Sequence, residues 1–247
     1  MIRLIQMPRV RGVWGLPNVS PACMKLETWL RMAEIPYELP ALDLVNAPKG
    51  KVPYIVELDG SRMGDSTFII EHLKSKVGKD PDAHLTDEQR AISLAFRRMM
   101  KENFYWVIVQ SRYKDEPNWK IYKELVLTLL DGVPMEQRPM VCDMYKQRIE
   151  GQMYGHGIGR HSAKEVYELG IADLKSVSDM LGNKPYLLGD RPSTVDATVY
   201  AYVANLLQTP VDCAAKDYGL SLKNVVDYLE RMELRYFPEL RPLRLSA

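Results

Sequence analysis

The chain has 247 residues and a formal net charge of +1, with 46% apolar and 26% charged residues. This composition is typical of a globular protein that buries a sizeable core, and it gives no electrostatic indication of a nucleic-acid partner. The three cysteines form no Cys-x-x-Cys pair, which excludes a disulfide framework and favours a reducing, cytoplasmic location. No apolar run approaches the roughly 20 residues of a membrane span, and we expect no signal peptide.

The first third of the chain mixes strand and helix signals. Residues 2–7 predict a short buried strand, and the Pro-, Gly- and Arg-rich stretch that follows predicts a loop up to residue 19. Ser20-Pro21 is a typical helix start, with Ser as N-cap and Pro at the first helical position. Pro36 ends this helix, and residues 37–42 predict a second strand.

The stretch 50–66 organises the rest of this region. Two apolar runs flank Asp59-Gly60, a dipeptide that favours a two-residue hairpin turn. Val52-Pro53 precedes the first run, where proline is tolerated at a strand start. Asp65-Ser66 closes the second run and begins a helix that extends to about Val77. A simpler interpretation of the pair is an ordinary Ser N-cap.

Residues 78–85 are polar, and we place a domain boundary there, between residues 1–77 and 86–247. Everything after it predicts helices. Capping boxes begin at Thr86, Ser162 and Ser193. We expect helices over 86–107, 117–130, 141–154, 162–182, 193–206 and 221–235, with Pro134 and Pro139 as interruptions.

The order strand, helix, strand, strand, strand, helix, followed by helices alone, resembles the glutathione transferases. It implies an α/β thioredoxin-like N-terminal domain plus an all-α C-terminal domain, the glutathione transferase fold. A narrower resemblance, to the failed-axon-connections and metaxin-like branch, extends over residues 2–237. The segments that carry it are SPACMKLETWLRMA (20–33), GKVP (50–53), FII (68–70), ENFYW (102–106), GHGIGR (155–160) and STVDATV (193–199).

The resemblance implies a glutathione site. Ser20 would hydrogen-bond the glutathione sulfur and stabilise its thiolate, whose free pKa of about 8.5 must fall for reaction at neutral pH. Val52 and a cis Pro53 would present main chain to the cysteinyl part, while Asp65 and Ser66 would hold the γ-glutamyl end. The alternative for Ser20 is a plain N-cap. Lys49 or Lys51 is available for the glycine carboxylate.

Two further features admit a structural and a functional interpretation. Cys23 lies one turn after Ser20, at the position of a resolving cysteine, but it shares an apolar face and is more typical of a buried core thiol. Tyr105 and Trp106 lie on the first long helix of the second domain. They line an electrophile pocket in the transferase interpretation and are ordinary core residues otherwise.

The segment 155–161, GHGIGRH, is neither a dinucleotide fingerprint nor a metal site, because no strand precedes it and no further ligands accompany His156 and His161. It predicts an ordered turn before Ser162, with Arg160 as a candidate anion contact. We expect no metal cofactor.

Two hypotheses of function follow. The first is a transferase that conjugates the glutathione thiolate to small apolar electrophiles, with glutathione as co-substrate. The second is a non-catalytic module of the same fold that serves protein–protein interaction, as in metaxin-like proteins. The resemblance also implies a homodimer.

Overall fold

The computed structural model describes residues 1–8, 14–130 and 132–240, and residues 9–13 of the predicted first loop lie outside that part. A four-stranded sheet forms with the order β2-β1-β3-β4. Its strands are β1 (Ile2–Ile5), β2 (Tyr37–Glu38), β3 (Tyr54–Val56) and β4 (Arg62–Gly64). The first two strands are shorter than predicted: β1 stops before Met7, and β2 has two residues where six were expected.

The register of the strands determines which loops meet. β1 pairs in parallel with β2 and antiparallel with β3, and β3 pairs antiparallel with β4. Ile5 faces Tyr54, and Tyr54 in turn faces Gly64. The end of β1, the start of β3 and the end of β4 therefore lie side by side. The segments that follow β1, precede β3 and follow β4 leave the sheet at this same end.

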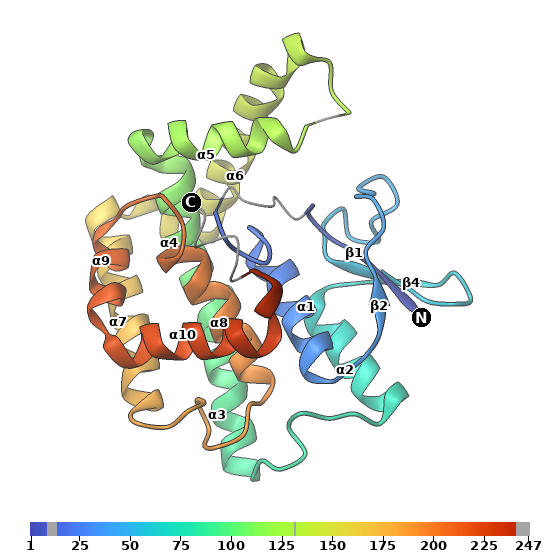
Figure 1. Cartoon of the computed structure of the whole chain (residues 1–247). Helices are drawn as coiled ribbons and strands as arrows, with labels where there is room; N and C mark the ends of the chain where they lie inside the picture. The colour runs from blue at the N-terminus through green and yellow to red at the C-terminus, as the bar shows by residue number, and fades with distance from the viewer. Residues whose placement is uncertain (9–13, 131, 241–247) are drawn as a thin grey trace.

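Two helices pack with the sheet, as Figure 1 shows. α1 (Pro21–Met32) begins after Ser20 as expected, and α2 (Ser66–Val77) ends at Gly78, which has the positive φ of a left-handed C-cap. The N-cap of α2 is Asp65 and not Ser66, so the alternative interpretation of Ser66 as an ordinary N-cap is wrong. Buried apolar side chains of β1, β3, α1 and α2 form the first core, among them Leu4, Leu26, Trp29, Leu30, Ile55, Ile69, Ile70 and Leu73.

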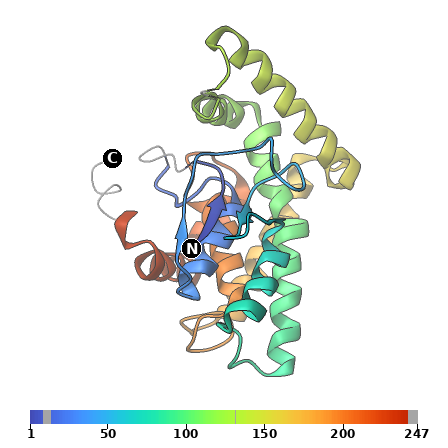
Figure 2. The ribbon, with the colours of Figure 1, turned by 90° about the vertical axis from the view of Figure 1, so that its right-hand side faces the viewer.

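The rest of the chain is helical. Its elements are α3 (Asp87–Arg98), the π-helical segment η1 (Met99–Phe104), α4 (Tyr105–Val109), the π-helical segment η2 (Gln110–Lys114), α5 (Glu116–Thr128), α6 (Arg138–His156), α7 (Ala163–Leu181), α8 (Thr194–Leu207), α9 (Ala214–Ser221) and α10 (Lys223–Tyr236). Figure 2 shows α3 running into α4 along one side of the molecule.

One predicted helix start in this part was wrong, and one helix was not predicted. α6 begins at Arg138 and not at Val141, because Pro139 occupies the first turn, where a missing N–H costs nothing. α9 was not expected: only two of its residues, Ala215 and Gly219, are buried, so its apolar pattern is weak. The capping boxes at Thr86, Ser162 and Ser193 are confirmed.

α8 lies at the centre of the helical part, and every one of its residues is buried. The carboxylate of Asp196 accepts hydrogen bonds from the Ser193 and Leu187 amides at 2.8 and 2.9 Å. The buried Tyr228 of α10 donates to the Asp196 carbonyl at 3.0 Å. The box at Ser193 therefore fixes the start of the most buried helix.

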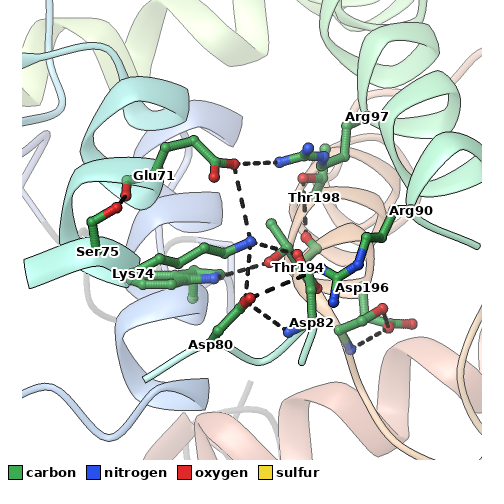
Figure 3. A network of polar contacts seen from close by, with 12 residues as sticks. Glu71, Lys74, Ser75, Asp80, Asp82, Arg90, Arg97, Thr194, Asp196 and Thr198 are labelled. Carbon is green, nitrogen blue, oxygen red and sulfur yellow. Dashed lines mark hydrogen bonds and ion pairs between the residues drawn. The ribbon is translucent and has the colours of Figure 1, made fainter. Parts of the chain in front are cut away.

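The segment 78–85 is bonded into a polar network between the sheet side and the helices (Figure 3). The buried Asp82 accepts hydrogen bonds from the Thr194 amide and from Lys74, both at 2.6 Å. Burial alone would raise the pKa of Asp82, but these two donors lower it below its ordinary value. Trp29 of α1 donates to the Thr194 hydroxyl at 3.1 Å. The segment thus joins the two parts closely, and the domain boundary itself stays a prediction.

Among the described helices, none is both long and apolar enough for a bilayer crossing.

Candidate functional site

The residues that the sequence singled out converge at one end of the sheet. Ser20 begins α1 after the loop that follows β1, Pro53 immediately precedes β3, and Asp65 immediately follows β4. Because Ile5, Tyr54 and Gly64 are consecutive partners across the sheet, these three segments emerge together. Residues that are 45 positions apart in the sequence are thereby brought to one edge of the molecule.

Ser20 occupies the N-cap of α1. Its hydroxyl oxygen accepts a hydrogen bond from the Cys23 amide at a long 3.5 Å, and its own amide donates to the Asn18 side chain at 2.9 Å. Asn18 in turn donates to the Met7 carbonyl at 2.8 Å. The capping role is therefore present. It uses the Ser20 oxygen as an acceptor and leaves the hydroxyl hydrogen able to donate, to the Cys23 side chain or to an acceptor on a ligand.

Cys23 is a core thiol. Its side chain is buried, and burial raises the pKa of the thiol to about 11, although hydrogen bonds with Ser20 and the Met7 backbone oppose this rise. A thiol with such a pKa forms almost no thiolate at neutral pH, so it is neither nucleophilic nor easily oxidised.

A buried arginine that the sequence reasoning missed holds the loop before Ser20. Arg112 in η2 is 3% exposed and donates to the Val19 carbonyl at 2.7 Å. It also donates to the carbonyl and side-chain oxygens of Asn205 in α8, at 2.6 and 2.8 Å. Its guanidinium lies 5.6 and 5.3 Å from the ring centroids of Trp14 and Tyr122. Asn205 is a single asparagine in the apolar stretch 199–207, whereas Arg112 stands among the polar residues Gln110, Ser111 and Lys114 and has no such signal.

The Val52–Pro53 peptide bond is cis, as the resemblance implies. Pro53 is buried, whereas Lys49 and Lys51 are both exposed. Lys49 places its ammonium 4.7 Å above the ring of Phe68 in α2. The structure thus locates Lys49 beside α2 and gives Lys51 no such contact among the described residues.

Asp65 combines three features. Its carboxylate accepts from the Thr67 amide at 2.8 Å and pairs with Lys101 at 3.4 Å. Burial would raise the pKa of Asp65, but the Thr67 amide and the Lys101 ammonium lower it overall, so it is ionised. Its φ of +76° is disfavoured for any residue except glycine. Ser66, the first helical residue, is 5% exposed.

Tyr105 and Trp106 are in contact, with their ring centroids 5.0 Å apart, but their other neighbours differ. Trp106 packs against His156 of α6, with ring centroids 4.9 Å apart. Tyr105 faces another group of tyrosines: burial, aided by Tyr145 and Tyr122, raises its pKa to about 12. Tyr202 of α8 is buried, and burial and then the charges of Tyr105, Glu102 and Asp65 raise its pKa.

The glycine-rich segment forms the predicted turn. The 3₁₀ segment η4 (Ile158–Arg160) follows α6, and Ser162 caps α7 through a reciprocal bond with Glu165. Arg160 packs on the ring of Tyr154 at 4.9 Å. Within residues 1–8, 14–130 and 132–240, no group of three or more His, Cys, Asp or Glu side chains could hold a metal ion.

Fold and site together define a protein with a thioredoxin-like first part and a helical second part. The candidate site lies on the first part, at the end of the sheet where Ser20, Pro53 and Asp65 meet. The glutathione S-transferase N-terminal domain model matches residues 21–118, and the C-terminal domain model matches residues 170–232. The chain belongs to the glutathione S-transferase family.

Similar proteins fall into two groups. Isoprene-epoxide–glutathione S-transferase of Rhodococcus sp. (strain AD45) is 37% identical over 228 residues, which cover 90% of this chain and 95% of that protein. Failed axon connections of Drosophila melanogaster is 34% identical over 91% of this chain, and the chain spans 56% of that relative's length. Metaxin-1 of Mus musculus is 27% identical, with 92% of this chain and 73% of that protein covered. The expected resemblance to this branch is confirmed.

Among solved structures, the beta-etherase LigF from Sphingobium sp. strain SYK-6 superposes with a TM-score of 0.66 over 100% of this chain and 99% of that one. The two sequences are 16% identical, so this likeness concerns the fold. The predicted fold class is confirmed.

Proposed function

We propose that the protein is a glutathione transferase that adds the glutathione thiolate to a small apolar electrophile. The observation that carries the proposal is the convergence of Ser20, Pro53 and Asp65 at one end of the sheet. The relative that is 37% identical is named for an isoprene epoxide, so we propose an epoxide as the class of electrophile to test first.

In this proposal the site binds glutathione from one end to the other. The ionised Asp65 holds the γ-glutamyl ammonium, the start of α2 at Ser66 offers backbone N–H groups to the carboxylate, and Val52 offers main chain to the cysteinyl part. The sulfur lies at Ser20, at the positive end of the α1 dipole. The nearby Arg112 guanidinium adds a buried positive charge behind the same loop.

Thiolate formation is the step to which the chain contributes most directly. The hydroxyl of Ser20 donates a hydrogen bond to the sulfur, which stabilises the thiolate relative to the thiol. The thiolate then forms a bond to an epoxide carbon, the carbon–oxygen bond breaks, and the oxygen takes up a proton. Tyr105 stays protonated at neutral pH, with a pKa of about 12, and is suited to line the electrophile side as a neutral phenol.

A spectrophotometric assay with a chloronitrobenzene and with a small alkene epoxide tests this function. A hydrogen bond to a charged group is worth about 1.5–3 kcal/mol, so Ser20→Ala should lower kcat/KM by roughly 10- to 100-fold. Ser176→Ala on the exposed face of α7 is the matched control and should be silent. Equal rates for the Ser20 variant and the wild type would remove Ser20 from the mechanism.

A non-catalytic role in protein–protein contact is the second candidate, because Failed axon connections is 34% identical over 91% of the chain. A folded protein that neither binds glutathione nor turns over either electrophile would favour it. The homodimer and the cytoplasmic location stay predictions, and light scattering of the purified protein tests the first.

A further inference from the structure

A small pocket lies between α1, α2, α3 and η1, beside Lys101, the ion-pair partner of Asp65. Its lining is formed by Lys25, Thr67, Leu94, Arg97, Arg98 and Lys101. Four of these six residues are cations. Thr67 belongs to the first turn of α2, and Lys101 pairs with Asp65, so the pocket adjoins the start of that helix.

Three of the four cations have a carboxylate of their own. Arg97 pairs with Glu71 at 3.5 Å, Arg98 with Glu102 at 3.6 Å, and Lys101 with Asp65 at 3.4 Å. These three ion pairs neutralise three of the four positive charges, and the fourth cation of the lining has no such pair.

Lys25 is that fourth cation. It is 4% exposed, and its ammonium donates to the Thr67 hydroxyl at 3.4 Å, a long bond to a neutral group. Within the described residues, no carboxylate lies within 4.0 Å of it. A buried ammonium without a counter-ion is costly, since burial strips it of water. The Nε of Arg97, in the same lining, is also buried without a hydrogen-bond partner in the described part of the chain.

The size of the pocket limits what it can hold. Its volume is about 20 Å³, which is room for roughly one water-sized oxygen. A carboxylate that inserts one oxygen fits this space.

We propose that this pocket is an anion subsite in which Lys25 is the counter-ion of the γ-glutamyl carboxylate of bound glutathione. The assignment rests on the proposed function, because it is the glutathione interpretation that places this carboxylate at the start of α2. Arg97 and Lys101 supply the surrounding positive potential, and the ligand supplies the negative charge that Lys25 lacks.

The protonation of Lys25 gives the subsite a measurable signature. Burial and then the charge of Lys101 lower the pKa of Lys25 to about 7, against a partial opposing effect of Asp65. At pH 8 about nine-tenths of the free amine is therefore neutral. A carboxylate in the pocket stabilises the ammonium, so binding takes up close to one proton. The charged groups that face Lys25 are Asp65, Arg97, Arg98 and Lys101.

The test is calorimetric titration at pH 8 in two amine buffers of different ionisation enthalpy. The ligand is S-methylglutathione, because its thioether cannot release a proton and obscure the uptake. The wild type should take up nearly one proton per ligand bound. Lys25→Arg, which keeps a permanent charge, should bind without uptake. Lys25→Met should bind at least tenfold more weakly and without uptake, and the exposed Lys164→Met should behave as wild type.

A thermal-shift series with L-glutamate and with acetate separates this subsite from the proposed function. Binding of S-methylglutathione without proton uptake, and with unchanged affinity in Lys25→Met, overturns the subsite and leaves glutathione binding standing. No binding of S-methylglutathione, with Lys25-dependent stabilisation by L-glutamate or acetate, overturns glutathione binding and supports a small-carboxylate site. If S-methylglutathione does not bind and neither L-glutamate nor acetate stabilises the protein, both the subsite and glutathione binding are overturned.

Discussion

Two polar regions of this protein differ in whether their buried charges are paired with an opposite charge. In the network between α2, the segment 78–85 and α8, the buried Asp82 has two donors at 2.6 Å and one of them is the cation Lys74. At the end of the sheet that carries the candidate site, Lys25 and Arg112 are each less than 5% exposed. No carboxylate of the described residues pairs with either of these two cations.

The difference distinguishes buried charges that stabilise the fold through ion pairs from buried charges that a bound ligand can neutralise. A buried ion pair with satisfied hydrogen bonds holds two parts of a fold in register, whereas a buried cation without an anion lowers stability. Two such cations flank the candidate site, one behind Ser20 and one behind Thr67. Glutathione carries two carboxylates and reacts as a thiolate, so its negative charge suits an electropositive site.

The largest expected loss of stability comes from disrupting the polar network around Asp82. Asp82→Ala leaves the buried Thr194 amide without an acceptor and removes the shortest ion pair of Lys74, which keeps Asp80 at 3.2 Å, so it should lower the free energy of unfolding by about 3 kcal/mol. Urea denaturation measures this, with the exposed Asp179→Ala, expected within about 0.5 kcal/mol of wild type, as control. Glutathione binding by the folded variant should be unchanged.

The same substitution has a pH signature. Because the folded state lowers the pKa of Asp82, its contribution is present above the unfolded value near 3.9 and is lost as the pH falls through the folded pKa. The gap between wild type and Asp82→Ala should therefore narrow in acid. A gap that stays constant from pH 7 to pH 3 would show that the carboxylate charge is not what stabilises this region.

Arg112→Met should cost somewhat less stability and should also change the chemistry. It leaves the oxygens of Val19 and Asn205 without their donor, a loss of about 2–3 kcal/mol, part of which is regained because a buried charge disappears. It should also raise the pKa of the bound glutathione thiol, which ultraviolet thiolate absorbance reports. The exposed Arg148→Met should change neither quantity, and an unaltered thiol pKa in Arg112→Met would limit Arg112 to a structural role.

A smaller effect of opposite sign is expected at Asp65. Its positive φ carries a strain of order 1–3 kcal/mol, and glycine is both free of this strain and a fair N-cap. Asp65→Gly should therefore raise the free energy of unfolding by about 1 kcal/mol while it weakens glutathione binding. If Asp65→Gly is less stable than the wild type, or binds glutathione equally well, the strained backbone at Asp65 is not explained by glutathione binding.

No effect at all is expected when the native protein is treated with iodoacetamide at pH 8. The pKa of about 11 leaves Cys23 protonated, and its side chain is buried. Mass spectrometry should find this thiol alkylated only after denaturation. Rapid labelling of Cys23 in the folded state would restore the redox interpretation.

Local patterns were sufficient to predict most of the fold. Ser20-Pro21, Thr86, Ser162 and Ser193 mark helix starts through chemistry that lies within three or four residues, and all four are observed. Strand lengths were less predictable, because the two-residue β2 depends on how far it can pair with β1.

The candidate site was predictable only in part. Ser20, Pro53 and Asp65 each have a local signature, so the sequence and the family resemblance could select them. Lys25 and Arg112 have none: their importance depends on which charges surround them in space. Arg112 bonds to residues 93 positions away in both directions, which no sequence period reveals.

Calorimetric titration with reduced glutathione is the most direct test of whether this end of the sheet binds glutathione. The wild type should bind glutathione with a dissociation constant in the micromolar to low-millimolar range, and Asp65→Ala should lose that binding. Thr86→Ala, which removes an N-cap at α3, should bind as wild type does. No heat and no thermal shift with the wild type, or equal affinity in Asp65→Ala, would contradict a glutathione site at this end of the sheet.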